Sequence, residues 1–217
     1  MNLMINLTEK TISLFSKKTK GKILQESLLL FNEQTFNQTT TSNIAKSSDV
    51  LEGSLWYHFN SKNDLVSVHL GLFEESFNEQ QAHSQSDNQK DLILGIFSIY
   101  EVIWDFRYLM RDSFEQFSTD FPGLNKKIDV INSEIDNWAK NTIMHARDLG
   151  VLHIKDGDID SIVEISLIIG RHWLDYSMKK YPSKSNTYLR KKGINLLIKN
   201  FYPYLSPESK EIMDSLY

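Results

Sequence analysis

The chain has 217 residues, of which 41% are hydrophobic and 24% are charged, and its formal net charge is −4. This length and composition are ordinary for a globular protein with one large or two small domains. Because the chain has no cysteine, disulfide bonds, thiolate metal sites and cysteine nucleophiles are excluded. It has no apolar run near the roughly 18 residues of a membrane span, and its N-terminus lacks the pattern of a secretory signal. The composition predicts a soluble cytoplasmic protein.

The charge is unevenly distributed along the chain. Residues 1–65 carry seven lysines and six acidic side chains, a net charge of +1, so the remainder carries −5. Four of these lysines lie close together, at Lys17, Lys18, Lys20 and Lys22. A charge run is usually only solvated surface, but this one lies beside the motif described below. Its position favours a role in binding phosphates, which need local positive charge.

The first long helix is predicted over residues 19–34. Ile23, Ser27 and Leu30 recur three or four residues apart, which places them on one buried face. Thr19 can cap this helix, and a helix N-terminus is a favourable place for a phosphate. The segment before this helix is less determined and forms either a short extra helix or a loose arm.

Two short helices joined by a polar turn are predicted over residues 40–62. Thr40 can cap the first helix, and Ser47–Asp49 supply the residues that a tight turn needs. Leu55 and Phe59 are four apart and share one face of the second helix. That helix also carries outward hydrogen-bond donors, namely Ser54, Trp56, Tyr57 and His58. This pattern is typical of a helix-turn-helix, although spacing alone leaves a helical hairpin of an ordinary α domain equally open.

The residues of this region resemble the DNA-binding segment of the TetR family of bacterial regulators. That segment typically runs from an ILxxALxLFxxxGF helix through TTxxxIAxxAGVSxGxLYxHFxSKxxL. The match has no gap and includes Ile23-Leu24, Leu28, Phe31, Phe36, Thr39-Thr40, Ile44-Ala45, Val50, Gly53, Leu55, His58, Phe59, Ser61-Lys62 and Leu65. The resemblance implies an N-terminal helix-turn-helix followed by a larger helical effector domain.

The rest of the chain has helical periodicity throughout, and no period-two strand pattern occurs in the sequence. Further helices are predicted at 62–83, 90–111, 112–119, 124–149, 158–180 and 186–202, with a last short helix after Pro207. We therefore expect an all-α, TetR-like fold of about nine or ten helices. Residues 1–65 would form the arm and DNA-binding domain, and residues 66–217 the effector-binding and dimerisation domain. The helix that begins at Lys62 would link the two.

The two long helices near the C-terminus suggest a homodimer. Residues 158–180 are apolar nearly all round and include a stripe with small members, which permits close helix approach. The alternative is a deeply buried helix in a monomer, but TetR proteins commonly dimerise through their last two long helices. The residues expected at the interface are Ile162, Ser166, Gly170, Trp173, Ser177, Leu189, Gly193 and Leu197.

A second, narrower resemblance lies in the C-terminal half. The segments 107–112 (RYLMRD), 121–124 (FPGL) and 202–208 (YPYLSPE) look like a TetR subgroup with RYxxRD-like and PYL(S/T)PE-like motifs. Effector domains of this superfamily diverge quickly, so the resemblance carries no ligand identity.

The sequence offers little for catalysis. GxSxG, GxGxxG and GxxxxGK[ST] are all absent, and none of the six histidines has a carboxylate three residues before it. The Glu-x-x-His pairs of a di-iron helical bundle are therefore missing. We predict that the protein is not an enzyme and holds no metal or cofactor.

Candidate DNA contacts follow from position and from the resemblance. Helix starts and the basic arm favour phosphate contacts. By resemblance, TetR proteins usually contact the DNA backbone at the positions of Trp56 and His58. Outward residues of the second short helix can reach base edges. The full set is Thr19, Lys20, Lys22, Thr40, Ser42, Ser54, Trp56, Tyr57, His58 and Lys62. Trp56 has an alternative role as a packing residue beneath the first long helix.

Several positions depart from the family pattern at this motif. Thr35 and Asp49 stand where the family often has Gly, Leu51 replaces a capping Ser or Thr, and Trp56 replaces Tyr. Glu52 adds negative charge near DNA, which is tolerable if it accepts from a cytosine. These departures leave the operator sequence beyond prediction.

A ligand site is expected where aromatic and stray polar side chains interrupt apolar stripes. The candidates are Trp104, Arg107, Phe114, Phe117, Trp138, Thr142, His145 and His172, although each is as readily an ordinary core residue. We therefore predict a dimeric, ligand-responsive repressor that binds a palindromic DNA operator and a hydrophobic small-molecule effector. The alternative is a DNA-bound structural or cell-division factor on the same fold without an effector.

Overall fold

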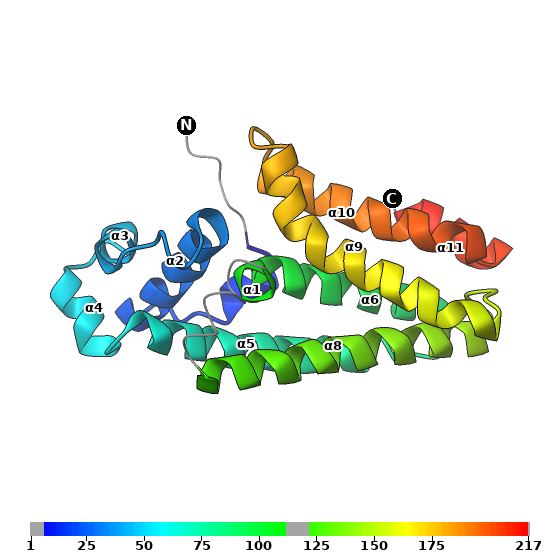
Figure 1. Ribbon diagram of the computed structural model, residues 1–217, viewed down its shortest axis with the longest axis horizontal. Coiled ribbons are helices and arrows are strands. Elements are labelled where there is room, and N and C mark those ends of the chain that lie inside the picture. The colour runs from blue at the N-terminus through cyan, green and yellow to red at the C-terminus, as the bar shows by residue number, and fades with distance from the viewer. Residues whose placement is uncertain (1–6, 112–121, 217) are drawn as a thin grey trace.

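The computed structural model describes residues 7–111 and 122–216, and within these segments the protein is all helical (Figure 1). The α-helices are α1 (Glu9–Ser13), α2 (Thr19–Gln34), α3 (Thr41–Ser47), α4 (Glu52–His58), α5 (Lys62–His83), α6 (Gln89–Asp105), α8 (Pro122–Asp148), α9 (Ile159–Lys180), α10 (Asn186–Phe201) and α11 (Pro207–Leu216). Short 3₁₀ turns follow at η1 (Arg107–Met110), η2 (Asp156–Asp158) and η3 (Tyr202–Tyr204). The all-α prediction is confirmed.

The helix-turn-helix forms as the sequence predicts. The Thr40 hydroxyl accepts from the Asn43 N–H at 3.1 Å and caps α3, and Ser61 caps α5 in the same way. Leu55 is fully buried against α2 and α3, which fixes the crossing of α4. One detail was wrong: Lys18, not Thr19, is the N-cap of α2, and it makes no side-chain capping bond.

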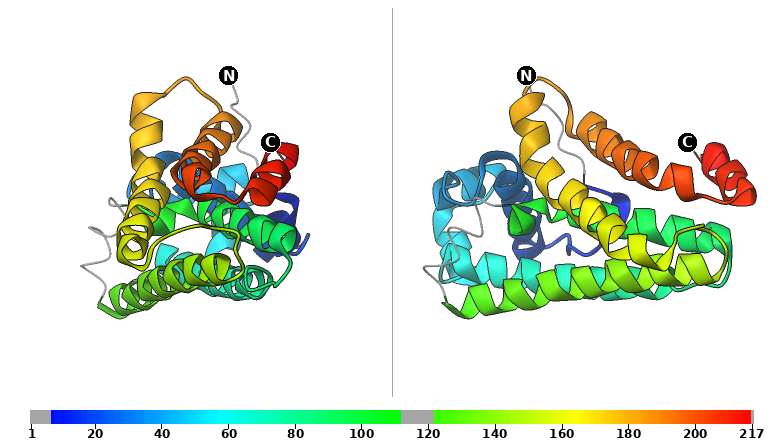
Figure 2. Two further views of the ribbon diagram at one scale, coloured as in Figure 1. Left: turned by 90° about the vertical axis from the view of Figure 1, so that its right-hand side faces the viewer. Right: turned by 45° about the vertical axis from the view of Figure 1, so that its right-hand side comes forward.

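The helices after α4 build a longer body beside the helix-turn-helix. α5 packs along α6, α8 packs against both α5 and α9, and α10 lies on α9 and α6. The views in Figure 2 show α10 and α11 on the side of α6 and α9 away from α5. None of the helices in the described part of the chain is long and apolar enough to cross a membrane.

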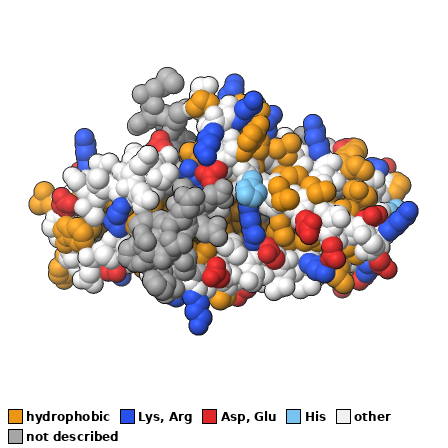
Figure 3. All heavy atoms as spheres, in the orientation of Figure 1, with side chains coloured by type: hydrophobic (Ala, Val, Ile, Leu, Met, Phe, Trp, Pro, Cys, Tyr) orange, Lys and Arg blue, Asp and Glu red, His pale blue; other side chains and the backbone are white. Residues whose placement is uncertain are grey.

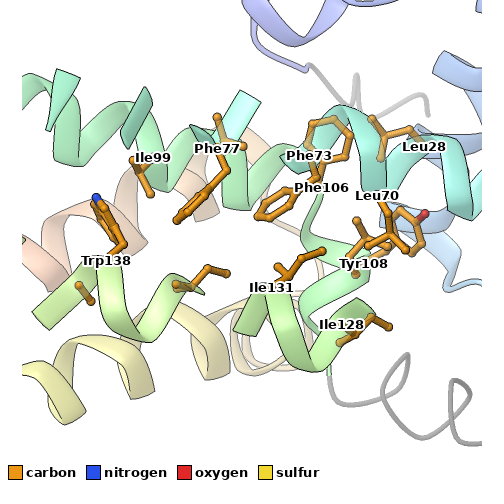
Figure 4. Packing of buried hydrophobic residues seen from close by; sticks show 14 of the residues in the cluster. Leu28, Leu70, Phe73, Phe77, Ile99, Phe106, Tyr108, Ile128, Ile131 and Trp138 are labelled. Carbon is orange, nitrogen blue, oxygen red and sulfur yellow. The ribbon is translucent and has the colours of Figure 1, made fainter. Parts of the chain in front are cut away.

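A row of aromatic side chains forms the core between α5, α6 and α8 (Figure 4). The rings of Phe73 and Phe77 stack with their centroids 5.8 Å apart, and Phe106 meets Phe73 edge-on at the same distance. Trp138 of α8 approaches Phe77 edge-on at 6.0 Å. Because aromatic side chains bury large apolar areas, this row binds α8 firmly to α5.

The predicted helix over 90–111 ends early, at Asp105. The side chain of Asn32 forms hydrogen bonds with two backbone groups that would otherwise continue the helix. The Asn32 amide donates to the Asp105 carbonyl at 2.6 Å and accepts from the Tyr108 N–H at 3.0 Å. A continuing α-helix would use both groups internally. The chain therefore turns into η1 instead, while the helix predicted at 112–119 lies outside the described residues.

Of the segment before α2, residues 7–18 are described, and they are packed rather than loose. Thr8 caps α1, and both its N–H and its hydroxyl donate to the Asp105 carboxylate, at 2.9 and 2.7 Å. Leu7 and Phe15 are buried in the core. The N-terminal segment therefore contacts α6, beyond the expected domain boundary at residue 65, and that boundary stays a prediction.

Candidate nucleic-acid interface and effector cavity

The outward face of α4 carries large side chains that the fold leaves in solvent. Tyr57 is 85% exposed and Trp56 is 44% exposed, whereas Leu55 and Phe59 point inward. The exposed fraction of Trp56 places it at the surface rather than beneath α2. Figure 1 shows α3 and α4 at one end of the molecule, away from the C-terminal helices. This end offers an exposed helix with donor side chains, which a DNA groove can accept.

The remaining DNA candidates fall into exposed and partly buried groups. Ser54 and His58 are partly buried on α4. The exposed group comprises Thr19, Lys20 and Lys22 at the start of α2, together with Thr40 and Ser42 at the start of α3. The basic cluster of α2 and the start of α3 thus leave cations and hydroxyls available to solvent near α4. Their contacts with DNA stay predictions.

Lys62 is engaged within the chain. Its ammonium donates to the carbonyls of Phe36 and Thr39, each at 2.8 Å, and lies 4.2 Å from the centre of the Phe36 ring. Burial lowers its pKa. An ammonium has three donors, so one is left for a phosphate. The first role of Lys62 is therefore to fasten the loop between α2 and α3 onto α5, which sequence reasoning missed.

Two acidic side chains brace the motif from the outside. Glu52 accepts from the Thr41 hydroxyl at 2.7 Å, which ties the start of α4 to the start of α3. Glu26 of α2 accepts from the Ser47 hydroxyl at the end of α3. Glu52 thus has a hydrogen-bond partner within the motif. A contact with a cytosine is not needed to account for a negative charge at this position.

The departures from the family pattern have visible backbone consequences. Thr35 and Asp49 both adopt positive φ, at 80° and 56°. Asp tolerates this region, whereas a β-branched residue such as Thr is strained there. Leu51 is the N-cap of α4, makes no capping bond and is 81% exposed. The absence of a cap at α4, expected from the sequence, is confirmed.

A cavity lies among α6, α8, α9 and α10. It encloses about 1120 Å³, counting the part that is open to solvent. Its walls are mainly aliphatic, and the lining side chains that carry N–H or O–H groups are Tyr100, Trp138, Thr142, Ser166 and Arg171. No Asp, Glu, Lys or His is found among its described lining residues. A cavity with walls of this apolar character suits small apolar molecules.

Two of the predicted ligand residues, Trp138 and Thr142, line this cavity, and four others do not. The His145 imidazole contacts the Ser86 carbonyl at 3.2 Å, and His172 is exposed on α9. Trp104 and Arg107 are buried elsewhere, where the guanidinium lies 4.9 Å from the Trp104 ring centre. These four side chains lie away from the cavity, because periodicity cannot tell a cavity wall from other core positions, and a role for them in ligand binding stays a prediction. Phe114 and Phe117 lie outside the described residues.

The predicted interface residues also lie inside the chain. Ser166, Gly170 and Leu197 line the cavity. The other five are covered by this chain's own side chains, and they are Ile162, Trp173, Ser177, Leu189 and Gly193. For example, the Trp173 indole donates to the Leu189 carbonyl at 3.0 Å. The small residues allow α9 and α10 to pack on each other within one chain, and the assignment of these residues to a dimer interface stays a prediction.

The outward face of α9 carries a different apolar stripe. Ile165, Ile168 and Tyr176 are exposed, with His172 between them at helical spacing. Figure 3 shows hydrophobic side chains gathered over the middle of α9. Contiguous exposed apolar side chains are uncommon on a monomer and often mark an interface.

A buried polar junction, formed by Asn32, His69, Asp105, Tyr108 and Arg111, joins α2, α5 and η1. Besides the Asn32 bonds described above, the Tyr108 hydroxyl and His69 Nδ1 lie 2.9 Å apart, and His69 Nε2 lies 3.0 Å from the Leu24 carbonyl. Burial lowers the pKa of His69 to about 4 and raises that of Tyr108. His69 is therefore neutral at pH 7.

Arg111 extends the junction to α9. Its Nε donates to Asp175 at 2.6 Å and its Nη1 donates to the Asn32 carbonyl at 3.3 Å. Both ends of this link are mostly buried, with side chains 9% and 15% exposed. The junction thus connects α9, which lines the cavity, with α2, which supports the helix-turn-helix. Tyr108 and Arg111 also belong to the RYLMRD segment singled out in the sequence.

Comparison with known protein families matches both parts of the chain. A family described as "Bacterial transcriptional repressor" matches residues 72–213, and "Bacterial regulatory proteins, tetR family" matches residues 23–68. The chain belongs to the TetR family. The first match includes the cavity helices, and the second includes the helix-turn-helix.

Relatives and solved structures agree with this membership. The chain is 25% identical over 128 residues to IcaR, a negative regulator of a biofilm operon in Staphylococcus epidermidis, covering 58% of this chain and 65% of that protein. It is 25% identical over 127 residues to the regulator QacR of Staphylococcus aureus, covering 55% and 66%. Across the curated relatives compared, the match covers between 33% and 66% of their length.

The fold matches a TetR-family regulator from Marinobacter aquaeolei with a TM-score of 0.72, at 22% identity over 91% of this chain and 96% of that one. At this identity the likeness shows the fold. Within the described residues no group of three His, Asp or Glu is placed to hold a metal ion.

Proposed function

We propose that this TetR-family protein is a ligand-responsive repressor that binds a palindromic operator as a homodimer. The observation that carries the proposal is the polar junction, which connects the walls of an apolar cavity to the helix that supports α3 and α4. A protein with only a DNA-binding role has no need of an apolar cavity in its second half. The cavity also disfavours the alternative of a structural factor without an effector, for which a fully packed domain is expected.

In the proposed DNA complex, α4 lies in the major groove and reads bases with Ser54 and Tyr57. Trp56 and His58 grip the backbone beside it. Phosphates are held by the basic cluster at the start of α2 and by the start of α3, where unpaired backbone N–H groups add to the attraction. The last free donor of Lys62 completes this set.

The proposed dimer uses the outward stripe of α9 that includes Ile165, Ile168 and Tyr176. Pairing with the same stripe of a second copy would remove these side chains from water and form a bundle with α10. A twofold dimer places two α4 helices on one side, about one DNA turn (roughly 34 Å) apart or somewhat more. This geometry requires a palindromic operator.

The proposed mechanism is a shift between two conformations. Occupying the cavity displaces α9 or α6, and the Arg111–Asp175 link and the Asn32 bonds carry that displacement to α2 and α5. The spacing of the two α4 helices then no longer fits the operator. The effector must bind this second conformation more tightly than the DNA-competent one, because otherwise no shift occurs.

Genome-wide mapping of bound DNA, followed by footprinting on the best site, tests the proposal. We expect a palindromic site near promoters that is protected by a dimer and released by a hydrophobic metabolite. An absence of sequence-specific binding at moderate salt contradicts the proposed function. A catalytic or membrane role is not part of the proposal, and we place the protein in the cytoplasm, where its DNA target lies.

A further inference from the structure

We propose that residues 179–192, the basic turn, form a second and sequence-independent DNA-binding surface. This turn joins the end of α9 to the start of α10 and would contact the phosphate backbone of a duplex segment other than the one held by α4. The surface lies outside both the helix-turn-helix and the cavity, so it goes beyond the proposed function. Its charge, its packing and its position on the molecule support the proposal.

The charge in this part of the chain is all of one sign. Between Asp175 and Glu208 there are seven Lys or Arg residues and no Asp or Glu, although the whole chain carries −4. Six of the seven lie in the basic turn, and they are Lys179, Lys180, Lys184, Arg190, Lys191 and Lys192. Residues 1–65, which include the helix-turn-helix, carry only +1. Positive charge is therefore more concentrated in the basic turn than in the DNA-binding motif.

These cations are available to a partner. Lys179, Lys180, Lys184 and Lys191 are exposed, and Figure 3 shows Lys and Arg side chains gathered over the α9–α10 turn. Across residues 7–111 and 122–216, none of the six cations forms an ion pair with an Asp or Glu side chain. Unpaired ammonium groups held close together repel one another, and an anionic partner relieves that repulsion.

Aromatic side chains hold the basic turn in one conformation. The rings of Tyr181 and Tyr188 meet edge-on with their centroids 6.3 Å apart. The Lys184 ammonium lies 5.3 Å from the centre of the Tyr188 ring, and the Lys192 ammonium lies at the same distance from Tyr181. The Ser185 hydroxyl caps α10. Because the turn is already ordered, its cations are presented together and little conformational entropy is lost on binding.

The exposed chemistry of the basic turn suits a phosphate backbone better than a bilayer. The exposed Ser183 and Thr187 supply hydroxyl donors beside the lysines, as is common at phosphate contacts. Leu189 is the one Leu, Ile, Val, Phe or Trp residue of the turn, and it is buried. The turn therefore has no aliphatic side chain to insert among lipid tails. Since this TetR-family chain is a DNA-binding regulator, DNA is a polyanion that it meets.

The basic turn and α4 lie in different places on the molecule. Figures 1 and 2 show α3 and α4 at one end of the long axis, whereas the α9–α10 turn lies on the flank, set back from that end. A straight duplex that crosses the α3–α4 end does not run over the turn. The turn is then free to contact a separate DNA segment. Contacts of this kind raise the local concentration of a protein on DNA and help it to move between segments.

Photocrosslinking tests the contact directly and needs no operator. The photoreactive residue p-benzoylphenylalanine replaces Ser183 in the basic turn or, as a control, Ser215, which is exposed on α11. Each full-length protein is irradiated at low salt with a fluorescent duplex of random sequence. We expect the crosslink from position 183 to be stronger than that from position 215 by about tenfold or more. Equal yields at the two positions overturn the proposal.

Two double variants show whether the lysines make the contact. Lys180→Gln with Lys184→Gln should lower the crosslink yield by about tenfold and reduce its salt dependence by about two charges, because each phosphate contact releases counterions. Lys90→Gln with Lys155→Gln removes the same charge at exposed positions elsewhere and should have little effect. A basic-turn variant that crosslinks like wild type contradicts the proposal, and so does a control variant that loses as much.

Unlabelled operator distinguishes a second DNA segment from the first. Saturating operator occupies the helix-turn-helix and should leave the crosslink between position 183 and the labelled random duplex within about twofold of its value. Loss of this crosslink would mean that the basic turn and α4 share one segment, which overturns the proposal. Failure to find any operator contradicts the proposed function alone, since the crosslinks to random DNA do not depend on it.

Anionic vesicles test the other class of partner. Vesicles of phosphatidylcholine and phosphatidylserine are sedimented with wild type and with the Lys180→Gln, Lys184→Gln variant. We expect no more wild-type protein than variant in the pellet. Wild-type sedimentation that is lost in the variant, without a crosslink to DNA from position 183, would identify a membrane surface as the partner and overturn the proposal.

Discussion

At the α3–α4 end of the molecule, polar side chains lie at the surface, whereas in the junction they are buried and paired with one another. Thr40, Glu52 and Ser61 brace or cap the helices at or near the surface. Asn32, His69 and Asp105 are completely buried. Surface polar groups can be exchanged at small cost, but an unpaired buried one is expensive. The first region is therefore free to adapt to DNA, and the second holds two parts of the chain in one geometry.

The largest expected effect of this difference is at Asn32. Asn32→Leu keeps the size of the side chain but leaves the Asp105 carbonyl and the Tyr108 N–H without partners. We expect the free energy of unfolding to fall by about 4 kcal/mol, since each orphaned buried group costs about 1–3 kcal/mol. Urea denaturation measures it. Asn141→Leu, at an exposed position of α8, is the control and should change the stability by less than about 0.5 kcal/mol.

The pH dependence of stability sharpens the comparison at His69. Its pKa is about 4 in the folded protein against an ordinary value of 6.5, so the unfolded chain binds more protons between these values. Stability is therefore complete above about pH 6.5 and falls as the pH drops toward 4, by about 3 kcal/mol for this group. Denaturation from pH 7 to pH 4.5 in wild type and His69→Gln measures it. The variant should show the flatter profile, and equal slopes would contradict the burial of a neutral imidazole.

Two lysines near the helix-turn-helix distinguish bracing from DNA binding. Lys62→Met leaves the carbonyls of Phe36 and Thr39 without their donor, so the free energy of unfolding should fall by about 1–2 kcal/mol. Lys22→Ala, at an exposed position, should leave stability unchanged and weaken operator binding at all sequences, with the salt dependence reduced by about one charge. Lys90→Ala on α6 is the control for both measurements. A Lys62→Met variant that is as stable as the wild type would contradict the bracing role of Lys62.

The smallest expected effect is a gain in stability at Thr35. Its φ of 80° strains a β-branched side chain, and glycine adopts this conformation without strain. Thr35→Gly should raise the free energy of unfolding by about 1 kcal/mol. The greater conformational entropy of glycine in the unfolded chain offsets part of this gain. Thr35→Ala keeps a Cβ and should gain little. A glycine variant that is no more stable than the alanine variant would show that the loop is unstrained.

The two regions also differ in how far the sequence predicts them. Short-range signals, such as Thr40 as a cap and Leu55 with Phe59 on one face, predict α3 and α4 because their causes lie within a few residues. Asn32 was not singled out, since its partners are more than 70 positions away in the sequence. Gly170 and Ser166 were predicted at an interface, because small residues on an apolar helix indicate close packing and a cavity wall equally well. Long-range pairing and empty space have no local signature.

The central claim is that occupancy of the cavity is transmitted to the helix-turn-helix through the junction. The most direct test is operator affinity, measured by fluorescence anisotropy with and without saturating methyl decanoate, an uncharged ester that suits apolar walls. It is measured in wild type and in Gly170→Met, whose longer side chain would fill space in the cavity that Gly170 lines. We predict that the ester weakens operator binding by about tenfold or more in wild type and has no effect in Gly170→Met. Unchanged operator affinity in wild type, while calorimetry shows the ester bound, would contradict the claim.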